Sequence, residues 1–335
     1  MEERRVRICD IAEELGLSTA TVSNVLHGKT NKVSDETVRR VQAALEEREY
    51  IPSMAGILLA QNASRIIGVV VNDHEKYEAH ALEDVFIAAS LNALSTEIER
   101  AGLFMMLKKT TRREEILRFA SMWNLDGLVL IGFCDADYAY LRSHMRVPFV
   151  VYDGYCPATE RIYNITIDNH SGGFQVGRHF RETGHRRALC LSDNCVCVDK
   201  DRWEGFREGF GDGAEFRQIP MQKAERDRFY RDNLDWLRTF SAVFAVSDFY
   251  ALELMRLLQA QGVAVPGEIA VAGFDDTPAC CQSLPPLTSV RQDVAVRAKM
   301  ALQKLRELKE KGEIQGEIRL PVTLVERDST RKRGK

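Results

Sequence analysis

Hydrophobic positions change their spacing near residue 65, and this change divides the chain into two regions. Before it, apolar residues recur three or four positions apart, which is the spacing of amphipathic helices. After it, short apolar runs such as IIGVVV (66–71) alternate with helical patterns. A continuous apolar run of this length is typical of a buried parallel strand. The pattern therefore predicts an all-α N-terminal region followed by an α/β region.

The N-terminal region begins with two short helices separated by a sharp turn, within residues 8–28 (ICDIAEELGLSTATVSNVLHG). Gly16 permits a left-handed turn, and the Ser18 hydroxyl can cap the second helix. Val22 is placed to fill the angle between the two helices, and a third helix is expected over residues 34–50. This pattern predicts a helix-turn-helix, whose second helix enters the DNA major groove. The alternative is an ordinary helical hairpin.

The α/β region alternates predicted strands and helices along its length. The expected strands are residues 66–71, 103–107, 127–132, 148–153, 187–192, 215–219, 242–247, 269–275 and 317–325. The expected helices are residues 81–101, 113–122, 137–145, 170–183, 200–210, 225–238, 248–261 and 293–311. This alternation predicts two doubly wound α/β lobes with parallel sheets, and a crevice at the carboxyl ends of their strands.

Composition and motifs argue against a membrane-spanning protein, a secreted protein and an enzyme. No apolar run approaches the length of about 18 residues that a membrane span requires, and MEERRVR at the N-terminus lacks the apolar segment of a secretory signal. The eight cysteines are irregularly spaced, so we expect a cytoplasmic protein with reduced thiols rather than a disulfide framework. No nucleophile elbow, phosphate-binding loop or metal-ligand set is recognisable, so neither an enzyme, a cofactor nor a metal is expected.

Charge alone does not indicate a nucleic acid partner, because the net charge is −3. The distribution is more informative, since basic residues of the N-terminal region recur in three groups: Arg4, Arg5 and Arg7; Lys29 and Lys32; Arg39 and Arg40. One cationic face is expected, and a single copy of it binds phosphates weakly. A dimer doubles the number of contacts.

Several segments match one known family in their order and spacing. They are DIAEELGLSTATVSNVLHG (10–28), VSDETVRRV (33–41), TGHRR (183–187), VPGEIAVAGFDD (265–276), PPLTSVRQD (285–293) and ERDST (326–330). With these segments the whole chain resembles the lactose-repressor-like (LacI/GalR) transcription regulators. The resemblance implies a DNA-binding headpiece (1–50), a hinge helix (51–64) and a two-lobed effector-binding and dimerisation domain (65–335). That domain is similar to periplasmic sugar-binding proteins, and members are mostly dimers on near-palindromic operators.

The resemblance also implies which residues make contacts. The expected DNA contacts are Ser18, Thr19, Ala20, Thr21, Ser23, Asn24, His27, Asn31 and, as a minor-groove wedge, Leu59. The effector contacts that the resemblance implies are Asp153, Arg202, Asp248, Asp275 and Gln292. Where the chain departs from the family pattern, Asp73 and His74 are expected to reach the crevice, and Phe249 to stack on a ring of the effector. Carboxylates with an arginine suit a carbohydrate-like effector, because hydroxyl groups both donate and accept hydrogen bonds.

Alternative interpretations remain open for parts of this set. Residues 72–84 (NDHEKYEAHALED) are longer and more polar than the corresponding family turn, which puts the usual effector in doubt. A metal site at His74, Glu78 and His80 is less favoured than a solvated surface, because their spacing fits no closed site. Asp248 is alternatively only the N-cap of its helix. Arg202 alternatively forms a surface ion pair with Asp199 or Asp201.

The sequence thus predicts a sequence-specific DNA-binding transcriptional regulator, a repressor and a homodimer. A small effector between the lobes is expected to change the affinity for operator DNA through a two-state equilibrium. One alternative is a regulator of the same fold that responds to a protein partner or a non-sugar ligand. Another is a solute-binding receptor, against which the N-terminal region argues.

Overall fold

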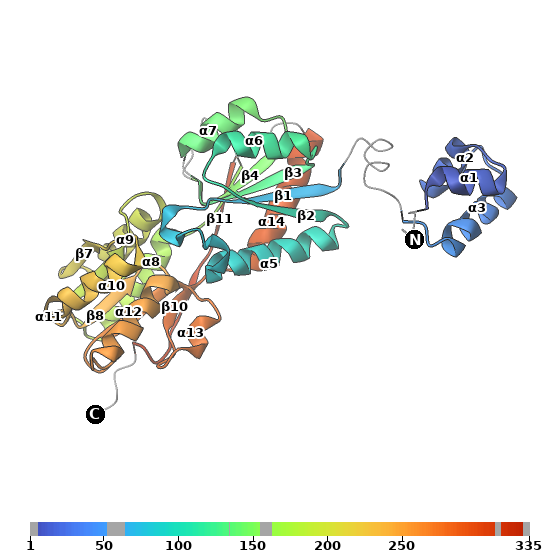
Figure 1. Cartoon of the computed structure of the whole chain (residues 1–335). Coiled ribbons are helices and arrows are strands. Elements are labelled where there is room, and N and C mark those ends of the chain that lie inside the picture. The colour runs from blue at the N-terminus through green and yellow to red at the C-terminus, as the bar shows by residue number, and fades with distance from the viewer. Residues whose placement is uncertain (1–5, 52–63, 134, 155–162, 312–315, 331–335) are drawn as a thin grey trace. The chain divides into compact units, whose positions relative to one another are not determined.

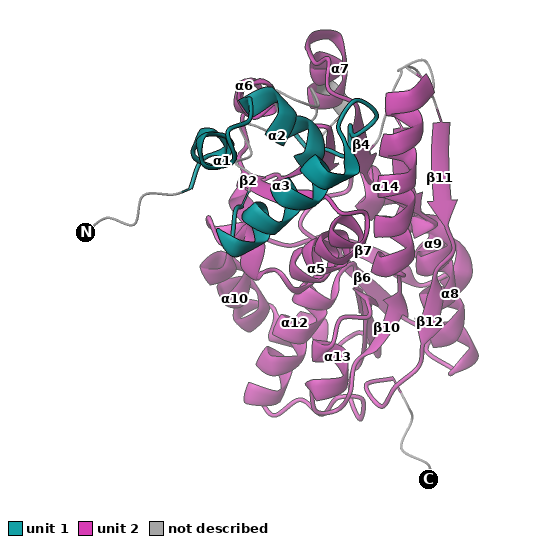
Figure 2. Cartoon of the chain, turned by 90° about the vertical axis from the view of Figure 1, so that its right-hand side faces the viewer, with its two compact units in different colours: residues 1–64 teal, residues 65–335 magenta. Residues whose placement is uncertain are grey.

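The fold is described from a computed structural model, and the described residues are 6–51, 64–133, 135–154, 163–311 and 316–330. The chain divides into two compact units, Met1–Ser64 and Arg65–Lys335, which Figure 2 colours separately. Within the described part, none of the helices is both long enough and apolar enough to cross a membrane.

The first unit contains three helices: α1 (Ile8–Leu15), α2 (Thr19–Leu26) and α3 (Asp35–Glu47). Gly16 takes the left-handed conformation with φ of 66°, which turns the chain between α1 and α2. The Ser18 hydroxyl accepts the Thr21 N–H at 3.1 Å, as the sequence predicts. Arg7 stands where a capping hydroxyl is usual, and the Asp10 carboxylate compensates by accepting the Arg7 N–H at 2.8 Å. The buried core is Ile11, Ala12, Val22, Val25, Val41 and Ala44.

The second unit contains two lobes, each built on a six-stranded sheet (Figure 1). In the N-lobe the strand order is β11-β5-β4-β3-β1-β2. Its strands are β1 (Ile66–Val71), β2 (Phe104–Lys109), β3 (Gly127–Ile131), β4 (Phe149–Tyr152), β5 (Tyr163–Ile167) and β11 (Gly316–Leu320). Its helices are α5 (Val85–Arg100), α6 (Arg113–Met122), α7 (Asp135–His144) and α14 (Val294–Lys311), with short 3-10 turns at η1 (Glu75–Tyr77) and η2 (Ala81–Glu83). Apolar residues of α5 and α14 pack on the sheet to form the N-lobe core.

In the C-lobe the strand order is β12-β10-β9-β8-β6-β7. Its strands are β6 (Ala188–Ser192), β7 (Ala214–Gln218), β8 (Ala242–Ala245), β9 (Ala270–Asp275), β10 (Thr288–Arg291) and β12 (Thr323–Val325). Its helices are α8 (Asn169–Glu182), α9 (Cys197–Phe210), α10 (Lys223–Asp232), α11 (Leu234–Leu237), α12 (Asp248–Ala260) and α13 (Ala279–Gln282). Only β12 is antiparallel to its neighbour among the described strands, so both sheets are essentially parallel, as predicted.

The chain crosses between the lobes three times, after β5, after β10 and after β11. The single strand predicted over residues 317–325 is therefore wrong. Pro321 interrupts it, because proline has no N–H for a sheet ladder, and the two halves β11 and β12 belong to different sheets. The helix predicted over residues 225–238 is likewise divided, into α10 and α11 at Asn233.

Candidate functional site

A cavity of about 740 Å³ lies between the two lobes. It is bounded by residues at or just beyond the carboxyl ends of three N-lobe strands and three C-lobe strands. The ends of parallel strands meet at one edge of each sheet, so a cavity forms where two such edges face each other. These residues are Val71, Ile131 and Tyr152 in the N-lobe, and Asp193, Val246 and Asp275 in the C-lobe.

The structure divides the predicted effector residues into two groups. Those that line the cavity are His74, Asp153, Arg202, Phe249 and Asp275. Those that lie outside its lining are Asp73, Asp248 and Gln292. Asp73 forms an ion pair with Lys109 at 3.2 Å.

Arg202 is buried in the cavity wall rather than paired on the surface, so the surface interpretation is wrong. Its Nε donates to Asn169 Oδ1 at 2.8 Å and its Nη1 donates to the Val246 carbonyl at 2.6 Å. The guanidinium also lies 3.7 Å from the centre of the Phe274 ring. These contacts fix the cation in one place before any ligand binds.

Close packing of α8 against α9 sets the position of Arg202. A Cβ atom at Gly173 would overlap the Arg202 backbone carbonyl, and one at Gly205 would overlap the His170 carbonyl. Glycine at these positions therefore lets the two helix backbones approach each other directly. The helix that carries Arg202 is located by backbone contact rather than by flexible side chains.

Asp275 ends β9 with a positive φ of 115°, a conformation that is unfavourable for a residue other than glycine. Gln292 holds the Asp275 carboxylate in place, because its Nε2 donates to Asp275 Oδ1 at 2.7 Å. Removal from water raises the pKa of Asp275 well above its ordinary value, and the nearby carboxylates of Asp248 and Asp84 raise it further, whereas Arg202 lowers it. Removal from water therefore outweighs the stabilisation of the Asp275 carboxylate by Arg202.

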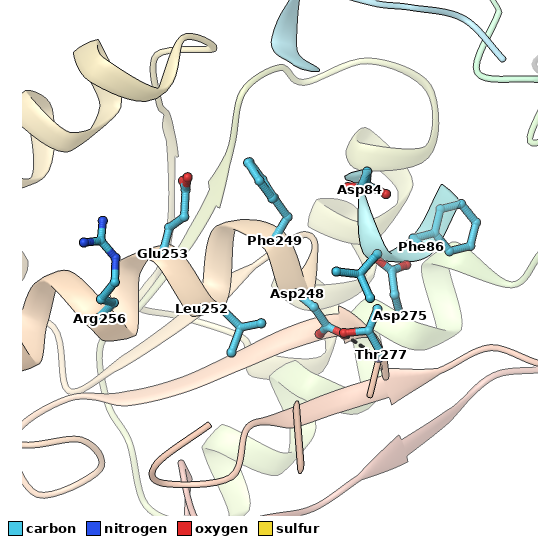
Figure 3. A pocket seen from close by; sticks show the side chains of 10 residues that line it. Asp84, Phe86, Asp248, Phe249, Leu252, Glu253, Arg256, Asp275 and Thr277 are labelled. Carbon is cyan, nitrogen blue, oxygen red and sulfur yellow. Dashed lines mark hydrogen bonds between the residues drawn. The ribbon is translucent and has the colours of Figure 1, made fainter. Parts of the chain in front are cut away.

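Asp248 accepts hydrogen bonds within the C-lobe, next to the cavity wall. Its Oδ2 accepts the Thr277 N–H at 2.8 Å, and its Oδ1 accepts the Ser289 hydroxyl at 2.5 Å. Ser247, not Asp248, caps α12, so the capping interpretation is wrong. Figure 3 shows Asp248 turned toward Thr277 and Phe249 extending away from it, at a smaller hollow of about 260 Å³ beside the main cavity.

Several cavity residues were not named from the sequence. They include Lys76, Tyr77, Asp84, Asp137 and Asp193. Burial lowers the pKa of Lys76, but the surrounding Tyr77, Asp193, Asp199 and Asp84 outweigh it and raise that pKa. The unusual polarity of residues 72–84 could have indicated that Lys76 faces the cavity. The position of Asp193 directly after an apolar run could have indicated a carboxylate at the cavity edge of the C-lobe.

Residues 72–84 do not assemble a metal site. His80 pairs with Glu83 at 2.8 Å, whereas Glu78 contacts the backbone of Lys223 in the C-lobe. No group of three metal-ligating side chains occurs within the described residues.

The second helix of the headpiece presents polar side chains to solvent. Ser18, Thr19, Ala20, Asn24 and Asn31 are exposed, and Thr21, Ser23 and His27 are half-buried. Ser18, Thr19 and Thr21 lie at the N-terminal end of α2, where its positive dipole end favours phosphate. Asn24, His27 and Asn31 lie in its last turn, at its C-cap and beyond it, respectively. Leu59 and most of the predicted hinge helix lie outside the described residues.

Comparison with known proteins supports both the N-terminal helix-turn-helix and the two-lobed region that follows it. Residues 7–53 match the model for bacterial regulatory proteins of the lacI family, and residues 178–330 match a periplasmic binding protein-like domain. The transcriptional regulator CelR of Thermobifida fusca is 28% identical over 339 residues, covering 97% of each chain. The repressor PurR of Vibrio atlanticus (strain LGP32) is 27% identical over 340 residues, covering 97% of this chain and 98% of PurR.

Solved structures confirm the fold. The lac repressor dimer bound to operator and the anti-inducer ONPF superposes with a TM-score of 0.84 at 24% identity, covering 98% of this chain and 99% of the repressor. The CelR–cellobiose complex superposes with a TM-score of 0.69 at 24% identity, covering 97% of this chain and all of CelR. The relatives matched over nearly the whole chain are transcriptional regulators rather than enzymes. Residues 7–53 therefore form a DNA-binding domain of the lacI type, residues 178–330 belong to a periplasmic binding protein-like domain, and the chain is a DNA-binding transcriptional regulator.

Proposed function

We propose that this regulator is a homodimeric repressor whose affinity for operator DNA is set by an uncharged, hydroxyl-rich effector bound between the lobes. The observation that carries the proposal is the interlobe cavity of about 740 Å³, to which both lobes contribute carboxylates. A ligand that contacts both lobes favours one angle between them, and it therefore shifts any equilibrium that depends on this angle.

The charges of the cavity wall favour a neutral polyol over an anion. The wall has seven carboxylates, from Glu75, Asp84, Asp137, Asp153, Asp193, Asp199 and Asp275, and two cationic side chains, from Lys76 and Arg202. A carboxylate or phosphate ligand would enter a site whose carboxyl groups outnumber its cations, although the pKa of Asp275 is raised and Asp153 is paired with Arg297. Sugar hydroxyls can instead donate to the carboxylates and accept from the cations.

Two further features of the wall support a sugar-like ligand. The Tyr152 hydroxyl is buried and has no hydrogen-bond partner among the described residues, so a ligand hydroxyl can satisfy it. The rings of Phe249 and Tyr250 offer apolar faces to a pyranose ring. The structure of the relative CelR is a complex with cellobiose.

On the DNA side, we propose that Thr19, Ala20 and Asn24 contact bases, of which Ala20 offers only apolar contact, for example to a thymine methyl group. The proposed backbone contacts, which set the register, are Ser18, Thr21, Ser23, His27 and Asn31. The headpiece is taken as residues 1–50 and the effector domain as residues 65–335, joined by a hinge at 51–64 whose Leu59 enters the minor groove. Two headpieces in a dimer suit a near-palindromic operator, in the cytoplasm where the DNA lies.

A thermal-shift screen tests the effector class directly, because ligand binding raises apparent stability by mass action. The panel contains cellobiose, glucose, ribose, gluconate and glucose 6-phosphate. We expect a neutral sugar to raise the melting temperature, to change DNA affinity in fluorescence anisotropy, and to lose both effects in Asp275→Asn. A shift produced only by gluconate or glucose 6-phosphate would contradict the proposed ligand charge.

A further inference from the structure

The segment after β1 is fastened to the N-lobe at both of its ends. Lys109, the last residue of β2, forms an ion pair with Asp73 at 3.2 Å and donates from the same Nζ to the Ala79 carbonyl at 2.5 Å. One lysine thus closes the segment 73–79 into a loop on the N-lobe. Lys76 and Tyr77 within this loop line the interlobe cavity.

The N-terminus of α10 in the C-lobe lacks a cap from its own lobe. The side chain of Gln222, the N-cap residue, makes no capping hydrogen bond. The N–H of Lys223 donates instead to Glu78 Oε1 at 3.1 Å. The first N–H groups of a helix have no partner within the helix, and its positive dipole end favours a carboxylate.

We infer that segment 73–79 is an interlobe strap, in which Glu78 of the N-lobe caps α10 of the C-lobe and so favours the closed arrangement of the lobes. Opening the lobes breaks this hydrogen bond and leaves the α10 N-terminus without its carboxylate. A cap of ordinary strength changes an equilibrium about fivefold. The strap therefore adjusts the lobe angle before any effector binds.

The backbone of the strap is held in one conformation. Glu78 and Ala79 take positive φ values of 49° and 67°, which residues other than glycine adopt only where surrounding contacts hold them. The same loop holds Lys76 at the cavity wall, near the C-lobe carboxylates of Asp193 and Asp199. Charge attraction across the cavity therefore acts in the same direction as the cap.

Hydrogen exchange of the Lys223 amide in the full chain, without DNA or effector, measures the strap directly. In Glu78→Ala we expect this amide to exchange about fivefold faster. Glu78→Gln should keep most of the protection, because its amide oxygen still accepts a hydrogen bond. Glu225→Ala is the matched control, since it removes an exposed carboxylate from the first turn of α10 that belongs to the C-lobe itself.

Two results would overturn the inference. One is unchanged Lys223 exchange in Glu78→Ala, and the other is an equal acceleration in Glu225→Ala. Small-angle X-ray scattering gives an independent measurement, because loss of the strap should increase the radius of gyration of Glu78→Ala but not of the control. Neither readout uses a ligand, so failure of the strap is distinguishable from failure of the proposed effector.

Discussion

Replacing Arg226 tests whether a buried cation holds one wall of the cavity. Arg226 has no exposed surface, and its Nε donates to Glu253 Oε2 at 2.7 Å. Its Nη1 donates to the carbonyls of Pro220 and Met221 at 3.1 and 2.6 Å. The guanidinium also lies 4.9 Å from the centre of the Tyr250 ring. One side chain thus joins α10, α12 and the loop that carries Met221 to the cavity.

Arg226→Met lowers the free energy of unfolding because it leaves the Glu253 carboxylate without its buried partner. Removing one partner of a buried ion pair costs roughly 3–5 kcal/mol, because the remaining charge is uncompensated. Glu253 is only 11% exposed, so it cannot recover full hydration. Lys223 Nζ, at 3.8 Å from Glu253 Oε1, retains part of the compensation. We therefore expect the free energy of unfolding to fall by about 3 kcal/mol, near the lower limit of that range.

Urea unfolding followed by tryptophan fluorescence measures this cost, because Trp203 and Trp236 pack against the C-lobe core. The control is Arg228→Met, an exposed arginine on the same helix, which should change stability by less than about 0.5 kcal/mol. The double variant Arg226→Met with Glu253→Leu should recover most of the loss, since a buried apolar pair is often as stable as an ion pair. Equal losses at Arg226 and Arg228, or no recovery in the double variant, would refute the reasoning.

Three other predictions concern DNA, helix packing and pH. Asn24→Ala should relax preference at one base pair of a selected operator, whereas Arg39→Ala should weaken binding to operator and random duplex alike, both measured by fluorescence anisotropy. Gly173→Ala should destabilise the C-lobe by roughly 1–3 kcal/mol in urea, because its methyl group would meet the Arg202 backbone. The raised pKa of Asp275 means that the folded chain holds this proton more tightly than the unfolded chain, so its contribution to stability falls as the pH rises above about 4. Asp275→Asn should therefore gain stability relative to the parent chain between pH 5 and pH 7 in urea titrations.

The elements predicted from the sequence are those with a strong local pattern. The residues 66–71 are apolar throughout and form β1, and residues 113–122 form α6 as expected. By contrast, β10 (TSVR) carries polar side chains that tertiary contacts satisfy, so no apolar run reveals it. β5 (YNITI) alternates apolar and polar residues, a strand pattern that the sequence analysis missed because it relied on continuous apolar runs, and its polar residues are also buried. Asn164, for example, hydrogen-bonds to the backbone of Gly154. The division of the last strand between two sheets depends equally on long-range pairing.

The residues that face the cavity were harder to predict than the elements that carry them. Motif position identifies the end of a strand, but it does not give the direction of the next side chain. Phe249 lines the cavity, whereas its neighbour Asp248 is turned into the C-lobe and bonded there. Lys76 was not identified because residues 72–84 are mostly polar, and such a pattern does not show which of their side chains faces the cavity.

Contacts behind the cavity link the carboxylates that the two lobes contribute. Asp153 of the N-lobe forms an ion pair with the buried Arg297 at 2.8 Å, and Arg297 Nη1 donates to Gln292 Oε1 at 3.4 Å. Gln292, on the crossover between β10 and α14, donates to Asp275 of the C-lobe at 2.7 Å. The chain Asp153–Arg297–Gln292–Asp275 therefore spans the lobes through a crossover. A ligand that contacts both terminal carboxylates adds a second link between them on the cavity side. Because the buried members have few alternative positions, we expect a ligand that displaces one carboxylate to affect the other through this chain of contacts.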